Sequence, residues 1–259
     1  MNNLSSRKFR QLTAISAVLL SVGMAGEASA AAVCSGSCGA LGANGVVTTS
    51  PEGGDYRWVS TDGGPSNSGL GLGGETNGST YSFTFDGTAA DPLEFFFNFV
   101  TSDGAGFADY AWVNLTLPSS TVVTLFTART TPSGNTVPGF GMPAISPGVT
   151  IDPATVLIIA GGPAWDPLGG SSGACFSAGC GYTDWVKADY ALPETGTYSI
   201  LFGVVNWADT AFQTGLAFDG VTVAGVPIDP EDPIPEPATL VLLGLGLAGL
   251  GGMRRRKAV

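Results

Sequence analysis

Residues 81–100 read YSFTFDGTAADPLEFFFNFV, and this stretch decides the fold class. In its first part, YSFTF, aromatic residues alternate with hydroxyl-bearing ones, which is the two-residue period of a strand with one buried face. Leu93–Val100 is a nearly unbroken apolar run and predicts a central strand buried on both faces. The stretch therefore predicts neighbouring β-strands rather than helix.

Further strand signals are short, apolar and bounded by glycine or proline: Trp112–Leu117, Thr121–Thr127, Thr155–Ala160, Thr197–Val205 and Leu216–Val223. The first two flank Pro118-Ser119-Ser120 and predict a hairpin. The apolar phase of the last slips at Gly220, as a glycine bulge would produce. Many short strands without a long internal repeat predict an all-β fold, a two-sheet β-sandwich of jelly-roll type.

Two stretches rich in glycine, or in glycine and proline, predict long loops, namely Gly63–Gly78 and Thr130–Pro153. Loops of this length in a compact domain are often functional. They are the first places where we expect a binding surface.

Residues 1–30 have the layout of a secretory signal peptide. Basic residues near the start precede an apolar run, Leu12–Ala25, and a small-residue cleavage site, Ala28-Ser29-Ala30. The apolar run is short for a membrane span, which favours cleavage by signal peptidase over a retained anchor. We expect the mature chain to begin at Ala31 and the sandwich domain to cover residues 31–225.

The expected domain is strongly acidic. Its only basic residues are Arg57, Arg129 and Lys187, and the whole chain carries a net charge of −11. Such a domain lacks the basic patch that phosphate contacts need, so we expect no binding to nucleic acid or to anionic membrane surfaces. The charge favours solubility and is also compatible with hard cations.

The cysteines form two close pairs, Cys34/Cys38 and Cys175/Cys180. An even number of cysteines after a signal peptide predicts disulfides in an oxidising compartment. Local pairing is the simplest connectivity, although the sequence does not choose between connectivities. Zinc is disfavoured because the spacings are CxxxC and CxxxxC rather than CxxC.

The sequence after Gly225 has three ordered parts. Residues 226–237 are acidic and rich in proline, which predicts an extended stalk ending in Pro235-Glu236-Pro237. Residues 238–253 are uncharged and rich in leucine, which predicts a short transmembrane helix. The tail 254–259 carries the basic residues Arg254, Arg255, Arg256 and Lys257. By the positive-inside rule this tail stays cytoplasmic and the domain lies outside.

A Pro-Glu-Pro triplet, a short apolar helix and a terminal basic cluster in this order resemble the PEP-CTERM sorting signal. The resemblance implies recognition by an exosortase, an integral-membrane protease-transpeptidase, usually in Gram-negative bacteria that make exopolysaccharide. Processing near the triplet would remove the helix. The alternative is an ordinary C-terminal anchor, which would not require the triplet.

The body resembles a group of uncharacterised bacterial β-sandwich domains that occur with such tails. The resemblance is carried by residues 98–104 (NFVTSDG), 109–113 (DYAWV) and 215–221 (GLAFDGV). It supports the fold and implies no activity.

The chain contains no histidine. This removes Ser-His-Asp and Cys-His catalysis, and no phosphate-binding or dinucleotide-binding motif is present. We therefore expect no enzymatic activity. A glycosidase needs only two carboxylates, and the candidate acids for that alternative are Glu75, Glu94 and Glu194, although no paired pattern singles them out.

Calcium is the one cofactor that the acidic residues suggest, because it prefers six to eight oxygen ligands. Asp103 and Asp109 border one turn, and Asp219 could approach from the closing strands, as could Asn206 and Asp209. There is no EF-hand spacing, so a site would be assembled across loops. The alternative is that these aspartates cap turns.

Six aromatic residues near loops are candidates for stacking on sugar rings, with core packing as the alternative: Tyr56, Trp58, Trp165, Tyr182, Trp185 and Trp207. The sequence as a whole predicts an exported protein of the cell envelope or exopolysaccharide matrix with a non-enzymatic structural or adhesive role. The alternatives are a carbohydrate-binding module for the host's own exopolysaccharide, with or without a requirement for calcium, and a secreted glycosidase.

Overall fold

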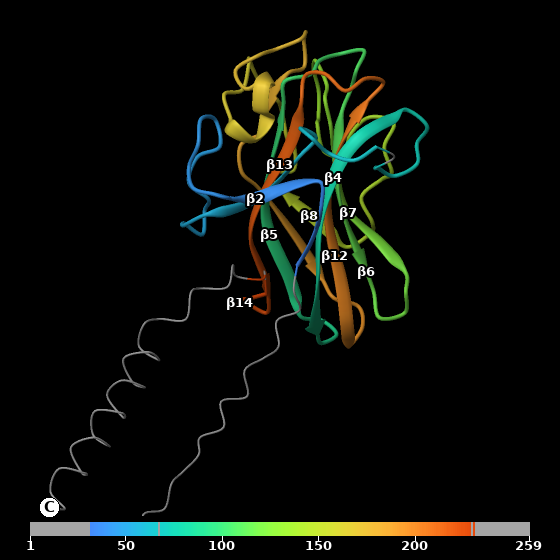
Figure 1. Ribbon diagram of the computed structural model, residues 1–259. Coiled ribbons are helices and arrows are strands. Elements are labelled where there is room, and N and C mark those ends of the chain that lie inside the picture. Colours follow the sequence, from blue (N-terminus) through green and yellow to red (C-terminus); the bar gives the residue numbers. More distant parts are fainter. Residues whose placement is uncertain (1–31, 67, 229, 231–259) are drawn as a thin grey trace, which may run out of the picture.

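The computed structural model describes residues 32–66, 68–228 and 230, which form a sandwich of two β-sheets (Figure 1). The first is a five-stranded sheet. Its strand order is β1 (Val33–Ser35), β4 (Glu75–Gly87), β12 (Gly196–Trp207), β6 (Tyr110–Thr116) and β7 (Val122–Arg129).

The second is a nine-stranded sheet. Its main path is β2 (Ser37–Leu41), β3 (Tyr56–Ser60), β13 (Thr214–Val223), β5 (Pro92–Thr101), β10 (Gly181–Tyr182) and β9 (Ile159–Ala160). Beside it, β11 (Val186–Ala191) pairs with both β5 and β8 (Val149–Asp152), and β14 (Val226–Pro227) pairs with β13. The chain crosses between the sheets from β1 to β2, β3 to β4, β4 to β5, β5 to β6, β7 to β8, β11 to β12 and β12 to β13. The predicted all-β sandwich with jelly-roll crossings is confirmed.

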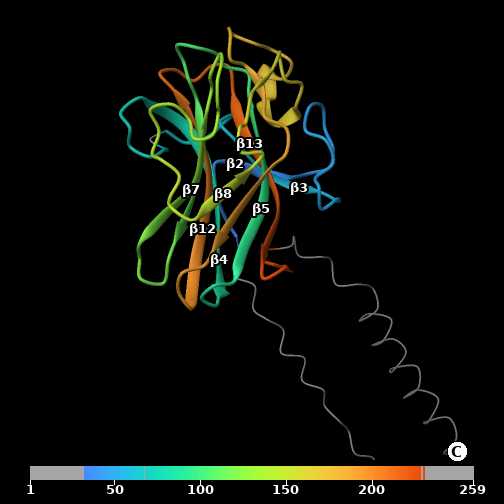
Figure 2. The same ribbon diagram turned by 180° about the vertical axis from the view of Figure 1, so that it is seen from behind.

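Long connections gather at one end of the sandwich, seen at the top of Figures 1 and 2. We call it the loop end. It comprises residues 61–66, 68–74, 102–109, 161–180 and 208–213, and it includes the short 3-10 helix η1 (Asp166–Ser171). The opposite end has only short turns, and β14 pairs there with the last residues of β13.

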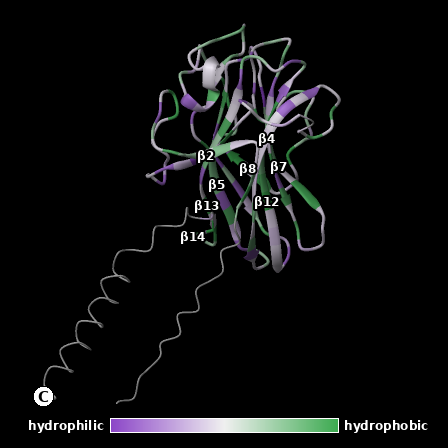
Figure 3. Cartoon of the chain, viewed as in Figure 1, coloured by the Kyte–Doolittle hydropathy of each residue, from purple (hydrophilic) through white to green (hydrophobic). Residues whose placement is uncertain are grey.

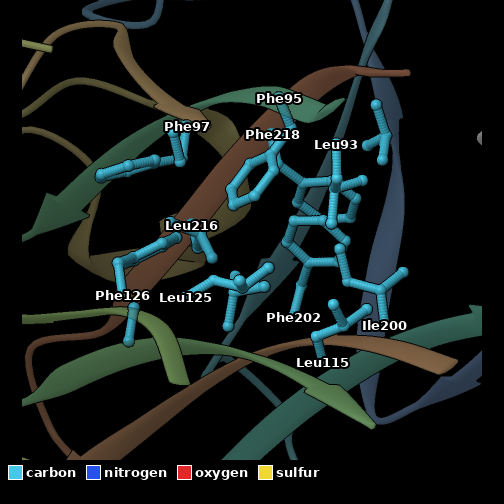
Figure 4. Packing of buried hydrophobic residues seen from close by; sticks show 14 of the residues in the cluster. Leu93, Phe95, Phe97, Leu115, Leu125, Phe126, Ile200, Phe202, Leu216 and Phe218 are labelled. Atoms are coloured by element: carbon cyan, nitrogen blue, oxygen red, sulfur yellow. The ribbon is translucent and has the colours of Figure 1, made fainter. Parts of the chain in front are cut away.

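The interior between the sheets is apolar and rich in aromatic rings. Hydrophobic and hydrophilic residues are interspersed along the strands (Figure 3), and the hydrophobic ones face the opposite sheet. Phe202 of β12 stacks on Phe218 of β13 with ring centroids 3.8 Å apart, and Phe97 of β5 stacks on Phe126 of β7 at the same distance (Figure 4). Stacked rings from opposite sheets therefore hold the layers together.

Most predicted strands are present. The YSFTF stretch lies in β4, Leu93–Val100 lies in β5, and β6 and β7 form the predicted hairpin. The bulge predicted at Gly220 is confirmed, because the pairing of β13 with β5 shifts register between Asp219 and Thr222 and Gly220 has φ +62°.

Two predictions need correction. Of Thr155–Ala160, only Ile159–Ala160 is a strand. Val156 is buried, but its backbone is hydrogen-bonded to Asn135 and Thr136 rather than to a neighbouring strand, and Leu157 is exposed. The predicted loops also extend too far: β4 already begins at Glu75, and Thr130–Pro153 contains β8.

Both predicted local disulfides are present, Cys34–Cys38 and Cys175–Cys180. The first joins β1 of the five-stranded sheet to β2 of the nine-stranded sheet, so it ties the two layers together at their edge. The second closes a loop that lies against residues 102–105, where Phe176 donates its N–H to the carbonyl of Ser102.

In the part of the chain that the structure describes, no helix is long and apolar enough to cross a membrane. The predicted signal peptide (1–30), Pro-Glu-Pro triplet (235–237), transmembrane helix (238–253) and basic tail (254–259) lie outside the described residues.

The stacked rings give a stability prediction. Phe202→Ala removes the ring that packs on Phe218 and Phe95, and we expect the free energy of unfolding to fall by about 3–5 kcal/mol. Guanidinium chloride denaturation measures it. The control Val122→Ala, at a side chain 57% exposed, should change stability by no more than about 0.5 kcal/mol. Equal losses in the two variants would contradict the assigned core.

Candidate functional site

The interior changes from apolar to polar at the loop end. Side chains two residues apart on a strand share a face, so the inward positions of β5 continue from Phe97 and Phe99 to Thr101, and those of β12 continue from Phe202 and Val204 to Asn206. The same extension on other strands leads to further polar residues, namely Thr61, Asn77, Asp109, Thr130 and Thr214. A layer of polar side chains therefore closes the sandwich there.

Asp109, at the centre of this layer, is fully buried. Its Oδ1 accepts a hydrogen bond from the backbone N–H of Trp207 in the five-stranded sheet (2.7 Å), and its Oδ2 accepts one from the hydroxyl of Thr214 in the nine-stranded sheet (2.6 Å). One carboxylate thus connects the two sheets.

Asp103 lies beside it and is 1% exposed. Its Oδ1 accepts the N–H of Gly104, and its own N–H donates to the hydroxyl of Thr101, which lies 2.7 Å from the hydroxyl of Thr214. Its Oδ2 has no hydrogen-bond partner. The threonine hydroxyls therefore link the backbone of Asp103 to the carboxylate of Asp109.

Asn206 approaches from β12 and is also fully buried. Its Nδ2 donates to Oδ1 of Asn77 (3.1 Å) and to Oε1 of Gln213 (3.2 Å). These two acceptors fix the orientation of the amide, since a flipped amide would place oxygen against oxygen. Its Oδ1 has no partner.

The cluster is electrostatically strained. Burial raises the pKa of Asp103 to about 7, against a hydrogen bond from Gly104 that lowers it. Burial, and then the charge of Asp103, raise the pKa of Asp109 well above its ordinary value. Asp209 raises the pKa of both carboxyls, so it lies near both. The nearby cation is Arg129, whose guanidinium is held between the rings of Phe140 and Trp207.

The structure brings together two of the three acids predicted as metal ligands. Asp219 faces away from the interior on β13, roughly 15 Å along the strand from Thr214. Among the described residues, no group of three or more His, Cys, Asp or Glu side chains could hold a metal ion. Any cation site would have to use amide oxygens beside Asp103 and Asp109.

Five of the six predicted aromatic residues share one cluster on the outer face of the nine-stranded sheet. Tyr56 and Trp165 are fully buried within it, and Nε1 of Trp165 donates to the hydroxyl of Tyr56 (2.8 Å). Trp58, Tyr182 and Trp185 are half-buried at its border. Trp207 belongs instead to a cluster with Tyr110 and Trp112 on the five-stranded sheet.

The three candidate glutamates of a glycosidase lie in different surroundings. Glu75 is bound by its own loop at the loop end, Glu94 pairs with Lys187 at 2.6 Å on the nine-stranded sheet, and Glu194 accepts hydrogen bonds from Ser119 at the opposite end. The structure does not bring them together.

Comparison with known proteins adds one finding about the tail. Residues 233–257 match the family model of the PEP-CTERM protein-sorting motif. The resemblance of the C-terminal tail is therefore confirmed, and the motif indicates an exported protein that is sorted at the membrane.

The other comparisons add little. No curated protein matches the chain. One solved structure, described as "Structural basis for the promiscuous specificity of the carbohydrate-binding modules from the beta-sandwich super family", aligns with 12% identity and a TM-score of 0.29. The alignment covers 74% of this chain and 55%, about half, of that chain. So low a similarity supports no inference about function.

Sequence reasoning missed Thr101, Thr130 and Thr214 as partners of the acids. The signal was available, because positions two residues from the inward Phe99, Leu216 and Ala128 are Thr101, Thr214 and Thr130. It also did not foresee the role of Glu75, whose carboxylate is enclosed by the N–H groups of Leu72, Gly73 and Gly74 and by the hydroxyl of Tyr110.

Glu75 gives a pH prediction. Partial burial acts to raise its pKa, but hydrogen bonds from the backbone of Leu72, Glu75 itself and Gly73 and from Tyr110 lower it to about 2. A depressed pKa stabilises the fold above the ordinary value of 4.5, and this contribution disappears as the pH falls through about 2. The free energy of unfolding of Glu75→Gln should therefore be about 1–2 kcal/mol below that of the wild type at pH 6, and very close to it near pH 2.

Urea denaturation of both proteins across that pH range makes the measurement. Glu52→Gln, at an exposed acid, is the matched control and should follow the wild type. A loss in Glu75→Gln that is independent of pH would contradict the role of the ionised carboxylate.

Proposed function

We propose that the protein is an exported exosortase substrate whose β-sandwich is displayed at the cell surface or in the exopolysaccharide matrix of a Gram-negative bacterium, where it has a non-enzymatic structural or adhesive role. The observation that carries the proposal is the sorting motif at residues 233–257, directly after a disulfide-containing sandwich. Signal peptidase and exosortase are the processing partners that this route requires.

The position of the exit point supports display. After β14, Ile228 donates its N–H to the carbonyl of Val221, and the carbonyl of Pro230 accepts a hydrogen bond from Arg57, so the last described residues still lie against the sandwich. They lie toward the Val223 end of β13, whereas Thr214 lies in the loop end, and the strand from Thr214 to Val223 spans roughly 30 Å. A tether at the C-terminus therefore directs the loop end away from the anchoring point.

A non-enzymatic role is supported by the residues available. The chain has no histidine, and its candidate glutamates are held apart in unrelated hydrogen-bond networks. A glycosidase would need two carboxyls facing one another across a site.

A second candidate function is carbohydrate binding. It is favoured by the half-buried Trp58, Tyr182 and Trp185, which border one aromatic cluster on the same sheet face. The ring of Trp185 is held in place, since Tyr56 lies edge-on to it at 5.6 Å and its Nε1 donates to the carbonyl of Thr48 (3.2 Å). Fixed, partly exposed rings present the apolar surface on which a sugar ring can stack.

The sorting proposal predicts that replacing Pro235, Glu236 and Pro237 by alanine in the host stops sorting, because the triplet is part of the recognised signal. Deleting Pro235–Val259 should release the domain into the medium. Cell fractionation and immunoblotting measure both. The control Asp229→Asn/Glu231→Gln alters the neighbouring acidic segment and should be sorted normally; normal sorting of the triplet variant would refute the proposal.

The carbohydrate proposal is tested on a glycan array with and without a calcium chelator. If a glycan binds, Trp185→Ala should weaken it by about 0.5–1.5 kcal/mol, roughly two- to tenfold in Kd. Phe140→Ala, at an exposed ring in contact with Arg129, is the control. Absence of binding to every glycan would leave the structural role, and release of sugar would favour a hydrolase.

A further inference from the structure

The loop end contains buried acceptor atoms that no donor satisfies. We propose that Asp103, Asp109 and Asn206 bind one hard divalent cation, with Ca²⁺ as the ion that best fits their oxygens. The site would fasten loop 102–109 to the ends of β12 and β13. It is independent of how the protein is sorted and of what its aromatic face binds.

The first argument concerns the unpartnered atoms. Oδ2 of Asp103 and Oδ1 of Asn206 are both buried without a hydrogen-bond partner, and while Asp103 is ionised both can only accept. An unsatisfied buried acceptor costs about 1–3 kcal/mol. A cation satisfies several acceptors at once without any donor group. No donor in this part of the interior reaches these two oxygens.

The second argument concerns convergence. Trp207, the residue after Asn206, donates to Oδ1 of Asp109, so Asn206 enters the interior next to that carboxylate. Gln213 bridges to the other side, because its Oε1 accepts from Asn206 and its backbone carbonyl accepts from Ser102, the residue before Asp103. Asp103, Asp109 and Asn206 thus surround one small region.

The third argument concerns charge. Two carboxylates are buried side by side, and Asp209 lies near both. The basic group packed nearby is Arg129, which donates its Nε–H to the carbonyl of Ala108 rather than to either carboxylate. A divalent cation neutralises the pair, whereas a buried water would satisfy hydrogen bonds and leave the repulsion in place.

The ligand chemistry selects the type of ion. The available atoms are carboxylate, amide and hydroxyl oxygens, the chain has no histidine, and the cysteines of the described residues are all in disulfides. Oxygen-only sites suit hard cations, and irregular geometry from several loops suits Ca²⁺ better than the strictly octahedral Mg²⁺. Exported modules typically bind Ca²⁺ with Kd of about 10⁻⁴–10⁻³ M.

The test uses the full chain purified in mild detergent. Elemental analysis after dialysis against Ca²⁺ should find one ion per chain, and the melting temperature should be about 3–6 °C higher at tenfold Kd of Ca²⁺ than in chelator. Mg²⁺ at the same concentration should shift it less. A chain that takes up no Ca²⁺ and melts at one temperature in both conditions overturns the proposal in favour of a buried water.

A variant separates metal binding from simple packing. Asp103→Asn keeps the shape but removes one charge, so Kd for Ca²⁺ should rise about tenfold or more, since affinity follows the charge of the ligands. In chelator this variant should be at least as stable as the wild type, because it relieves repulsion with Asp109. Equal destabilisation with and without Ca²⁺ would assign Asp103 a packing role and overturn the proposal.

Asp219→Asn is the matched control. Asp219 is another buried aspartate with an unpartnered oxygen, but it faces outward on β13, away from the cluster. The variant should bind Ca²⁺ as the wild type does. If it lost binding as Asp103→Asn does, the assignment of the site would be wrong.

Discussion

Asp109 lies fully buried between the two sheets and accepts one hydrogen bond from each. A buried carboxylate is tolerated only where its surroundings supply donors or positive charge, so the strands around it are constrained to end in polar residues. The Thr214, Thr101 and Thr130 hydroxyls meet this need by forming a connected chain beside the carboxylate. Each of these residues occupies the inward position next to an apolar one on its strand, on the side toward the loop end. The register that buries the phenylalanines therefore also places the polar layer, and a slip by one residue in any strand would disrupt both.

The sequence was sufficient for the strands whose patterns are local. Alternation in YSFTF, the apolar run of β5 and the slipped phase at Gly220 each follow from residues within one strand, and each is confirmed. The short strands β8, β10 and β11 were not predicted, because their residues become paired only through contacts with distant segments, such as Val186 opposite Phe97. For the same reason the sequence placed Asp103 and Asp109 correctly at one turn but grouped Asp219 with them. The two-residue period that points Phe218 inward assigns Asp219 to the outer face. The bulge at Gly220 follows directly, and it brings Val221 to the interior.

One edge of the sandwich is covered by the chain itself. β7 is the edge of the five-stranded sheet, and an uncovered edge invites pairing with another chain. Here the segment after β7 folds back over that edge: Ser146 donates its N–H to the carbonyl of Thr124, and Gly139 donates to that of Thr127. The predicted long loop Thr130–Pro153 therefore covers the edge strand β7. A search for a binding surface is better directed to the loop end and to the aromatic face.

These two regions differ in what they can offer a partner. On the aromatic face, Trp58, Tyr182 and Trp185 remain partly exposed over a rigid base formed by Tyr56 and Trp165. The cluster of Asp103 and Asp109 is closed, since both side chains are buried and the Cys175–Cys180 loop lies over residues 102–105. A closed cluster can hold an ion but cannot receive a sugar, so calcium and glycan binding belong to separate places. Calcium would then act on recognition only indirectly, through Gln213, whose N–H donates to Ser171 of η1, while Trp165 immediately before η1 packs beneath the aromatic face. This short helix is therefore one physical link between the two regions, and β5 is another, since Val100 belongs to the aromatic cluster and the adjacent Thr101 to the polar layer.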